Sequence, residues 1–532
     1  MKNSLKEKTH SIPAQVHTFF KAKRISTPAA ILIGVVIGLS ISRLFGGWST
    51  SSHPTQWRSS HTPSTSSHRQ QTRHPTQVPS IDQRFRILEL LTTLTPHYTR
   101  ECGAKVQPLY AQQASERYSP LIGHNPPSDG SWNEWVHKFT GLDEDSNTRK
   151  RETKSSKRGS DVAKAPHKYF FAINLYNSFD ILPDLFSTLF RVSAILGYPN
   201  IFVSIYENGS TDQTKALLRI FSSLTHAVGL RFTIRTSMRT RGAFNHRIEY
   251  LAEVRNAAFL PLHELRDGEG EIFDTIVFMN DVLPCVDDLL ELIYQSRLNN
   301  AGITCAADYM YHTELQTPVF YDNWVARDIN GTALENAPFE RVFNHPPSNS
   351  RWLAHLPVQV QSCWNGIAVL DPEPFYLASR VKFRMARITE GECSASECSL
   401  ICNDYWEAGY GRIMMVPRVK LAYDSKVYDL IHPARRNLTS IRGYVRLGGL
   451  PDNPRTDPQD RAWFGPHDRL FMEEESTPIE FTSGPSHVWC WGWDGAGDLE
   501  GPDVDPIWEE MSNKTRLPSA IKVRHDRGFE DL

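Results

Sequence analysis

The strongest constraint on the fold of this chain is an alternation of buried strands and amphipathic helices that begins near residue 168. Continuous apolar runs predict the strands, and apolar residues at helical spacing predict the helices between them. Strands joined by helices of crossover length favour a mostly parallel sheet with helices on both faces, an α/β fold. The predicted strands cover 168–175, 201–206, 230–236, 273–280 and 303–309, and the predicted helices cover 180–196, 211–226, 247–265 and 286–298.

The first 48 residues have the pattern of a membrane signal anchor. Residues 1–24 are basic, and residues 25–48 contain an apolar run centred on residues 29–41. Positive charge before the apolar run predicts a cytosolic N-terminus, hence a single-pass type II protein whose later residues are lumenal. The run is short for a bilayer-spanning helix, so a cleaved signal peptide and a soluble chain are the alternatives.

Composition divides the rest of the chain into four parts. Residues 49–80 are rich in Ser, Thr, Pro and His and predict a disordered stem, since they cannot bury enough apolar surface to fold. Residues 81–166 predict a helical lead-in and a charged linker, 167–445 the α/β domain, and 446–532 a C-terminal extension. The net charge of −2 provides no basic field, so no nucleic-acid partner is expected.

The eight cysteines predict disulfides or buried thiols in a lumenal chain. Three of them, Cys393, Cys398 and Cys402, lie close together, but no histidines stand at zinc-finger spacing, so a metal centre is not favoured. The pairing cannot be deduced from the sequence. Glycosylation sequons at Asn208, Asn330, Asn437 and Asn513 are compatible with a lumenal location.

Ligands of a parallel sheet bind outside the carboxyl ends of its strands, so the residues after each strand are the candidate site. After the second strand come Glu207, Asn208 and Asp212, which could hold a ribose or base; the alternative is an ordinary capped turn. After the fourth come Asn280 and Asp281, whose side-chain oxygens suit a hard divalent cation. The alternative there is a turn that starts a helix.

Three further residues could face the same crevice. Arg255 offers a guanidinium that matches phosphate oxygens, unless it only forms a helix salt bridge. Asp308 ends the fifth strand. His432 could complete a metal shell or contact phosphate, although a lone histidine usually does neither.

A later group of residues has side chains that suit a sugar. Trp364 can stack on a sugar ring, and Asn365 and Asp404 can bind sugar hydroxyls, with Gly366 in the same turn. The alternative for all four is core packing and a turn.

Seven blocks in order resemble the fungal capsule-associated mannosyltransferases, glycosyltransferase family 69, which are related to the cryptococcal α-1,3-mannosyltransferase. The resemblance covers about residues 168–435 and is specific because so many blocks keep their order. The blocks are residues 206–214, 252–260, 277–282, 305–311, 320–332, 361–370 and 397–406.

The resemblance implies a GT-A type, Rossmann-like fold, a GDP-mannose donor, retention of configuration, and a Golgi (or ER) membrane. It also implies a divalent cation such as Mn²⁺, with Mg²⁺ as the alternative. Asp281 would hold the metal, with His432 as a second contact, but Met279 departs from an Asp-x-Asp triplet. Glu207, Asn208 and Asp212 would lie near the nucleotide and Arg255 and Asn280 near the diphosphate, whereas Asp308, Trp364, Asn365, Gly366 and Asp404 would lie near the acceptor or reacting sugar.

The expected activity is transfer of mannose from a nucleotide-sugar donor to a glycan acceptor by a membrane-anchored, retaining α-mannosyltransferase. Asp281 and Arg255 would stabilise the charge on the departing diphosphate, and Asp404 would orient the acceptor. If the enzyme inverted configuration, Asp404 would be the general base. The alternatives are transfer of xylose or glucose to a glycolipid or small molecule, a lectin or scaffold without turnover, and a glycoside hydrolase.

Overall fold

The computed structural model describes residues 80–94, 113–114, 116–122, 166–238, 246–377, 381–390, 392–393, 395–432, 471–490 and 507–511. The chain divides after residue 68, and all of these residues belong to the part that covers 69–532. The predicted anchor and almost all of the predicted stem therefore lie outside the described residues. Within the described ranges, no helix is long and apolar enough to cross a membrane.

The described part of the chain is built on one sheet of ten strands. Their order across the sheet is β3-β2-β1-β4-β9-β5-β10-β8-β7, and β6 pairs with β5 outside this path. The strands are β1 (Tyr169–Leu175), β2 (Ile201–Glu207), β3 (Arg231–Thr236), β4 (Thr275–Met279), β5 (Ile303–His312), β6 (Thr317–Phe320), β7 (Arg327–Asp328), β8 (Val358–Ser362), β9 (Ile367–Leu370) and β10 (Ile413–Ala422).

The sheet is mixed, with a parallel core. Strands β1 to β4 are mutually parallel, and β5 is parallel to β10. Between β4 and β5 lies β9, which is antiparallel to both. The five predicted strands are confirmed within two or three residues, except that β5 runs further. The later strands β6 to β10 were not predicted.

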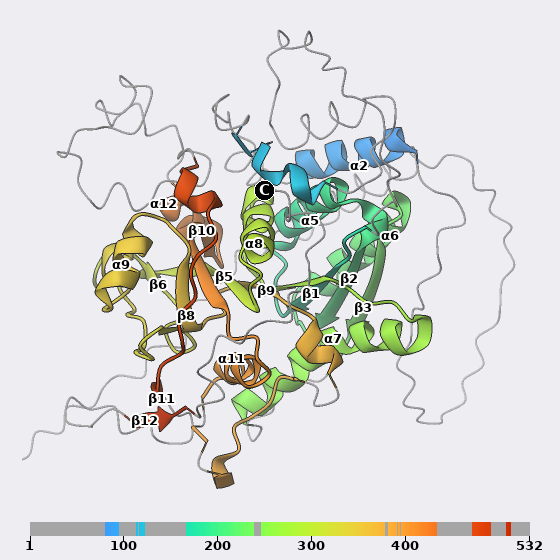
Figure 1. Ribbon diagram of the computed structural model, residues 1–532. Helices are drawn as coiled ribbons and strands as arrows, with labels where there is room; N and C mark the ends of the chain where they lie inside the picture. The colour runs from blue at the N-terminus through green and yellow to red at the C-terminus, as the bar shows by residue number, and fades with distance from the viewer. Residues whose placement is uncertain are drawn as a thin grey trace, which may run out of the picture. The chain divides into compact units, whose positions relative to one another are not determined.

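Helices cover both faces of the sheet, as predicted (Figure 1). Helices α2, α5, α6 and α8 pack together on one face, whereas α7 packs against β1 and β2 from the other and contacts α11. The helices are α2 (Ile81–Leu94), α5 (Leu182–Leu196), α6 (Thr214–Val228), α7 (Arg247–Glu269), α8 (Val286–Leu298), α9 (Pro346–Leu353), α10 (Glu373–Tyr376), α11 (Glu397–Glu407) and α12 (Ser425–Ile431). Short 3-10 turns lie at Ser119–Leu121, Tyr198–Asn200, Phe339–Arg341, Ile388–Glu390 and Glu473–Ser476, and a separate hairpin pairs β11 (His487–Cys490) with β12 (Ile507–Glu510).

Helix boundaries follow local chemistry. Helix α5 has a proline in its first turn and ends at Gly197, whose φ of 89° suits glycine. Its N-cap is Ile181, which makes no side-chain cap. The N-cap of α6 is Gln213, and the preceding Asp212 accepts a hydrogen bond from the Thr214 amide at 2.9 Å.

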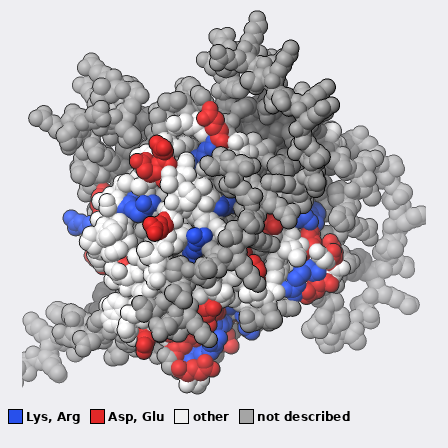
Figure 2. Space-filling model, viewed as in Figure 1, with Lys and Arg blue, Asp and Glu red and all other residues white. Residues whose placement is uncertain are grey.

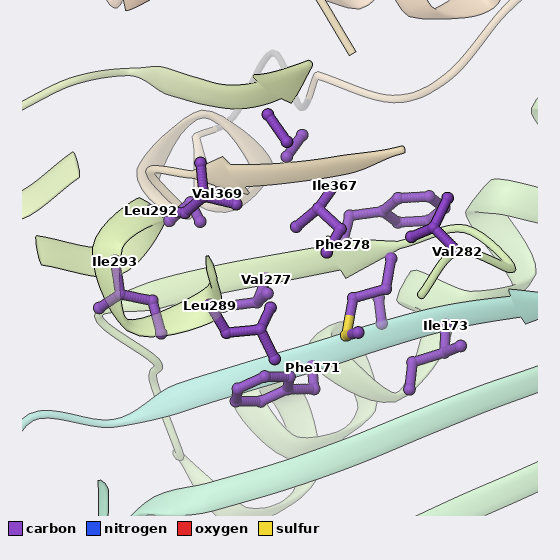
Figure 3. Packing of buried hydrophobic residues seen from close by; sticks show 14 of the residues in the cluster. Phe171, Ile173, Val277, Phe278, Val282, Leu289, Leu292, Ile293, Ile367 and Val369 are labelled. Atoms are coloured by element: carbon purple, nitrogen blue, oxygen red, sulfur yellow. The ribbon is translucent and has the colours of Figure 1, made fainter. Parts of the chain in front are cut away.

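The core lies between the sheet and helix α8. Figure 3 shows apolar side chains of β1 and β4 facing Leu289, Leu292 and Ile293 of α8, with Ile367 and Val369 of β9 beside them. All of these side chains are at most 1% exposed. Such close packing holds the strands rigidly, so the loops at their carboxyl ends start from fixed points.

The cysteines include both of the predicted kinds. Cys305 of β5 is bonded to Cys363, and Cys393 is bonded to Cys490 of β11. Cys398 and Cys402 on α11 are buried free thiols. The first disulfide attaches the segment after β8 to the strand that carries Asp308.

Charged side chains of both signs lie on one face of the described residues. On the face shown in Figure 2, Lys and Arg lie among Asp and Glu, and no large area of the described atoms carries one sign. This face therefore shows no extended basic patch of the kind that attracts a polyanion.

A buried charge network joins distant parts of the chain. Arg117 forms a bidentate pair with Glu291 of α8 at 2.7 Å, and Arg418 of β10 pairs with Glu475 at 2.7 and 2.9 Å. Arg117 also donates to the Glu475 carbonyl at 3.0 Å, which connects the two pairs. All four residues are at most 8% exposed. Although burial opposes it, the Arg117 charge holds the pKa of Glu291 below its ordinary value.

The substitution Arg117→Met should lower the stability of the protein strongly. It leaves the Glu291 carboxylate buried without its cation, which typically costs about 3–5 kcal/mol. Thermal and denaturant unfolding of the full chain would measure the loss, with exposed Arg86→Met as the matched control. The double variant Arg117→Met/Glu291→Leu should recover part of the loss, and a double variant as unstable as the single one would contradict this reading.

Candidate active site

The carboxyl ends of the core strands meet at one edge of the sheet. Strands β1 to β4 run the same way, and β9 is antiparallel to both β4 and β5, so β5 and its parallel neighbour β10 share that direction. The loops after β2, β4, β5 and β10 therefore lie along the same edge. This is where ligands of open α/β sheets bind.

Strand β4 presents Asn280 and Asp281 at this edge. The Asn280 amide donates to the Gly366 carbonyl at 2.9 Å, and its side-chain oxygen accepts from Arg255 at 3.2 Å. Apart from the backbone of Asp281 itself, no residue in the described ranges donates a hydrogen bond to the Asp281 carboxylate. Burial raises the pKa of Asp281, while the nearby Arg255 charge opposes that rise. Asp281 is thus an unengaged carboxylate fixed at the end of a buried strand.

Arg255 on α7 is held beneath this loop by an acid and three aromatic rings. Its Nε donates to Glu397 of α11 at 2.8 Å. Its guanidinium lies 5.0 Å from the Phe278 ring centroid and 5.2 Å from that of Trp364. Arg255 therefore makes a buried ion pair rather than the surface salt bridge that was the alternative, and it supports Asn280 from below.

Trp364 belongs to the packing that surrounds Arg255. Its ring is fully buried and packs on Phe278 and Phe383 with centroid distances of 5.0 and 5.4 Å. A buried ring cannot stack on a sugar in this conformation, so its place in the structure fits the core-packing alternative. Its predicted contact with substrate stays a prediction.

The turn at Asn365 and Gly366 connects the end of β4 with Asp308 in the middle of β5. Both residues have positive φ, 46° and 86°. A Cβ on Gly366 would lie 3.0 Å from Val282 and 3.2 Å from Leu421, so the turn requires glycine there. Asn365 donates from its side chain to Asp308 at 2.8 Å. Because Asn365 contacts Asp308 and Gly366 contacts Asn280, the turn fixes the position of Asp308 relative to Asp281.

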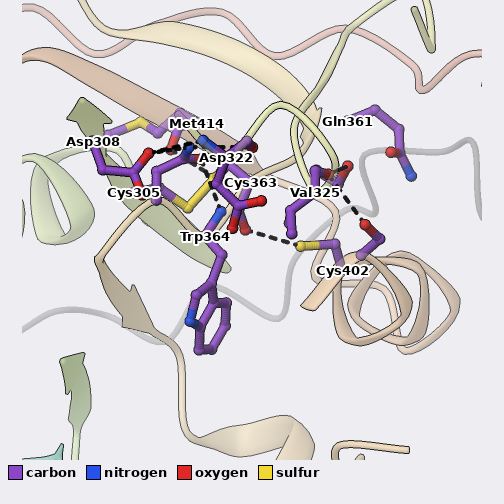
Figure 4. Close-up of a disulfide and its surroundings, with 12 residues drawn as sticks. Cys305, Asp308, Asp322, Val325, Gln361, Cys363, Trp364, Cys402 and Met414 are labelled. Atoms are coloured by element: carbon purple, nitrogen blue, oxygen red, sulfur yellow. Dashed lines mark hydrogen bonds between the residues drawn. A yellow bond between two sulfur atoms is a disulfide. The ribbon is translucent and has the colours of Figure 1, made fainter. Parts of the chain in front are cut away.

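Asp308 is fully buried and saturated with hydrogen bonds. Besides Asn365, the Tyr423 hydroxyl donates to it at 2.8 Å and the Asp322 amide at 3.3 Å. Burial raises the pKa of Asp308. Figure 4 shows Asp308 and Asp322 together beside the Cys305–Cys363 disulfide. Asp308 therefore organises its neighbours, and its oxygens have little capacity left for a ligand.

Asp322 is a site residue that the sequence did not single out. Its carboxylate accepts no hydrogen bond from any residue in the described ranges, although its own amide and carbonyl are both bonded. Burial and the neighbouring Asp308 carboxylate raise the pKa of Asp322 to about 7. Segment 320–332 carries the family resemblance, but an Asp after a short antiparallel strand has no spacing signal of its own.

Hydrogen bonds to the carboxylates of Glu207 and Asp212 stabilise the loop after β2. Glu207 is fully buried and accepts a hydrogen bond from the Ser210 amide, and Lys215 lies 3.7 Å from its second oxygen. Asp212 accepts from the amides of Phe179 and Thr214. Asn208 is half-buried, with its side chain 3.4 Å from the Tyr250 hydroxyl. Of the three predicted nucleotide contacts, only Asn208 keeps most of its hydrogen-bonding capacity.

Asp404 and His432 make contacts outside this cluster. Asp404 lies two turns along α11 from Glu397, and both of its oxygens accept from Arg384, at 2.7 and 3.0 Å. His432 follows α12 and donates from Nε2 to the Lys420 carbonyl at 2.8 Å. The described residues contain no group of three or more His, Cys, Asp or Glu that could hold a metal. The predicted roles of these two residues remain predictions.

Sequence comparison decides the family. The chain is 35% identical over 338 residues to the α-1,3-mannosyltransferase CMT1 of Cryptococcus neoformans var. neoformans serotype D, covering 60% of this chain and 69% of that protein. Residues 168–404 match the family model described as Cryptococcal mannosyltransferase 1. The chain belongs to this family. It is a mannosyltransferase, a glycosyltransferase of class EC 2.4.1.

Solved structures show only distant likenesses to this mannosyltransferase. The mannosyltransferase PcManGT from Pyrobaculum calidifontis, in complex with GDP-Man and Mn²⁺, is 12% identical with a TM-score of 0.30, covering 64% of this chain and 76% of that one. GalNAc-T7 with UDP, GalNAc and Mn²⁺ is 13% identical with a TM-score of 0.28, covering 48% and 42%. No residue role is transferred from such distant structures.

The free energy of unfolding of the Asp322→Asn variant should increase relative to that of wild type as the pH is raised. The folded state holds a proton on Asp322 up to about pH 7, whereas the unfolded chain releases it near pH 4, so wild type loses stability across that window. The asparagine variant lacks this loss. After allowance for partial exposure, we expect a relative gain of about 1–2 kcal/mol between pH 5 and pH 8.

Thermal unfolding of both full-length proteins across this pH range measures the effect. The groups that face Asp322 are Asp308, Glu397, Arg255 and Arg247, and all of them are kept in the variant. Exposed Asp180→Asn is the matched control for the loss of one carboxylate. Parallel pH profiles for Asp322→Asn and wild type would contradict the prediction.

Proposed function

We propose that this mannosyltransferase takes mannose from GDP-mannose and transfers it, with retention of configuration, to a glycan acceptor. Support for a mannosyl donor comes from the family, and GDP as its carrier is what the resemblance implies. The free Asp281 carboxylate, at the carboxyl edge of the parallel core, is the observation that carries the proposal. A GT-A interpretation of the mixed sheet belongs to the same proposal.

The residues at the β4 edge fit a divalent cation bound jointly with a donor. A cation of the Mg²⁺ or Mn²⁺ type usually takes one or two carboxylates and completes its shell with substrate phosphates and water. Asp281 offers an unengaged carboxylate of this kind, whereas Asp308 and Asp404 are occupied by protein donors. Mn²⁺, when bound, would neutralise charge on the diphosphate as it leaves.

The chain's own residues would act by holding and orienting the donor. The Asn280 amide is bonded to the Gly366 carbonyl, and the Asn280 side chain is bonded to the Arg255 guanidinium, so the neighbouring Asp281 is held in place. The loop therefore needs no rearrangement when negative charge develops on the departing diphosphate. The sugar C1–O bond breaks with its electron pair on the diphosphate, and a bond from C1 to the acceptor oxygen forms. In a retaining reaction a diphosphate oxygen takes the acceptor proton. The bidentate contact with Arg384 argues that Asp404 is not a free general base.

The substitution Asp281→Asn should abolish donor binding that depends on a cation. Donor at about 100 times its Kd stabilises a folded protein by about 2.7 kcal/mol. We therefore expect Mn²⁺-dependent thermal stabilisation of the full-length wild type by GDP-mannose, and no such shift for the variant. Mannosyl transfer should fall by about 100-fold or more.

Several controls make this experiment decisive. Exposed Glu269→Gln changes a remote carboxylate in the same way and should behave as wild type. UDP-xylose and UDP-glucose test the alternative donors, and EDTA tests the cation. A stabilisation by GDP-mannose that survives in Asp281→Asn would overturn the assignment of the donor site. The anomeric configuration of the product, read by NMR, distinguishes retention from inversion.

We also propose that residues 25–48 anchor the enzyme in a Golgi or ER membrane with residues 81–532 in the lumen. The basic flank before the apolar run and the disulfides support this orientation, since disulfides persist in oxidising compartments. In sealed microsomes, protease should leave the lumenal part of the full chain intact until detergent is added. Complete digestion without detergent would reject the topology.

A further inference from the structure

We infer that Tyr321 and Asp322 form the subsite that binds the acceptor sugar. The inference rests on the proposed function of the neighbouring donor site. Tyr321 is 42% exposed, and its ring meets Tyr423 edge to face with a centroid distance of 5.5 Å. The side chain that follows it in the sequence is the free Asp322 carboxylate. An exposed aromatic face beside a carboxylate suits the C–H face and the hydroxyls of a sugar ring.

The backbone holds this pair in a fixed position. The Tyr321 amide donates to the Asp308 carbonyl at 2.9 Å, and the Asp322 amide donates to the Asp308 side chain at 3.3 Å. The Asn365 side chain contacts the Asp322 carbonyl at 3.4 Å. Both residues are thus held against Asp308, near the middle of β5, so a sugar would meet a preorganised surface.

The pair lies within electrostatic reach of the proposed donor site. Burial is the main cause of the raised pKa of Tyr321. The carboxylates of Asp322, Asp308 and Asp281 raise this pKa further, and the Arg247 charge lowers it. In the sheet order, β5 and β6 lie on the far side of β4 from β1 and β2. The Asn208 loop and the Tyr321–Asp322 pair therefore lie on opposite sides of Asp281. In this arrangement the nucleotide would bind on the Asn208 side of the site and the acceptor on the Tyr321 side.

The local charge selects the kind of ligand. Asp308, Asp322 and Glu397 lie close together, and the Glu397 charge is already engaged by Arg255. The free oxygens of the Asp322 carboxyl group can accept hydrogen bonds from hydroxyl groups, and the group can donate one when it is protonated. Asp308 has no oxygen free for a cation. The chemistry therefore fits a neutral polyhydroxylated ring, that is, a glycoside acceptor.

The test compares donor chemistry and acceptor binding in the full-length enzyme. The probe acceptor is methyl α-mannoside. Tyr321→Ala and Asp322→Asn should each raise the KM for this probe about tenfold or more, while the hydrolysis of GDP-mannose by water and its binding stay within about twofold of wild type. Tyr321→Phe keeps the ring and should stay close to wild type. Tyr311→Ala, which removes another exposed tyrosine further out on the same hairpin, is the matched control.

Saturation-transfer NMR with methyl α-mannoside alone gives a readout that needs no donor. A signal in wild type that is lost in Tyr321→Ala supports the subsite even if GDP-mannose proves to be the wrong donor. An absent signal in wild type, an unchanged KM in both variants, or an equal loss of donor hydrolysis would overturn the inference. Failure of the donor proposal would appear separately, as GDP-mannose that neither binds nor is hydrolysed by wild type.

Discussion

The site depends on one short antiparallel strand that lies between two parallel ones. Strand β9 separates β4 from β5, and the turn that enters it bonds to Asn280 on one side and to Asp308 on the other. The turn therefore fixes the position of Asn280 and Asp281 relative to Asp308. Both residues of the turn have positive φ, and a Cβ at Gly366 would crowd Val282 and Leu421, so the geometry of the turn requires glycine at this position.

The first half of the fold could be read from the sequence because its signals are local. Buried strands from β1 to β5 alternate with helices of regular period, and the boundaries of α8 match the prediction at both ends. The second half lacks such signals: β6, β7 and β9 have two to four residues, and their pairing depends on distant partners. The same limit explains why Asp281 was found at the end of a clear strand, whereas Asp322 was not.

Residue type alone does not show which polar side chains are already engaged. Arg255, predicted to contact a diphosphate, pairs with Glu397, and Asp404, predicted to orient an acceptor, pairs with Arg384. Asp212 and one oxygen of Glu207 accept hydrogen bonds from nearby backbone amides, whereas the second Glu207 oxygen is buried without a hydrogen-bond partner. Asp281 and Asp322 differ because no side chain in the described residues donates a hydrogen bond to their carboxylates, a property that depends on tertiary structure. The predicted roles of all these residues stay predictions.

The buried charge network has a consequence for biosynthesis. Domains generally begin to fold from the N-terminal side as the chain emerges from the ribosome. The Glu291 carboxylate is neutralised by Arg117, which precedes it in the chain, whereas Arg418 pairs with Glu475, the last of the four residues to be synthesised. The network is therefore complete only after residue 475 has been added to the chain.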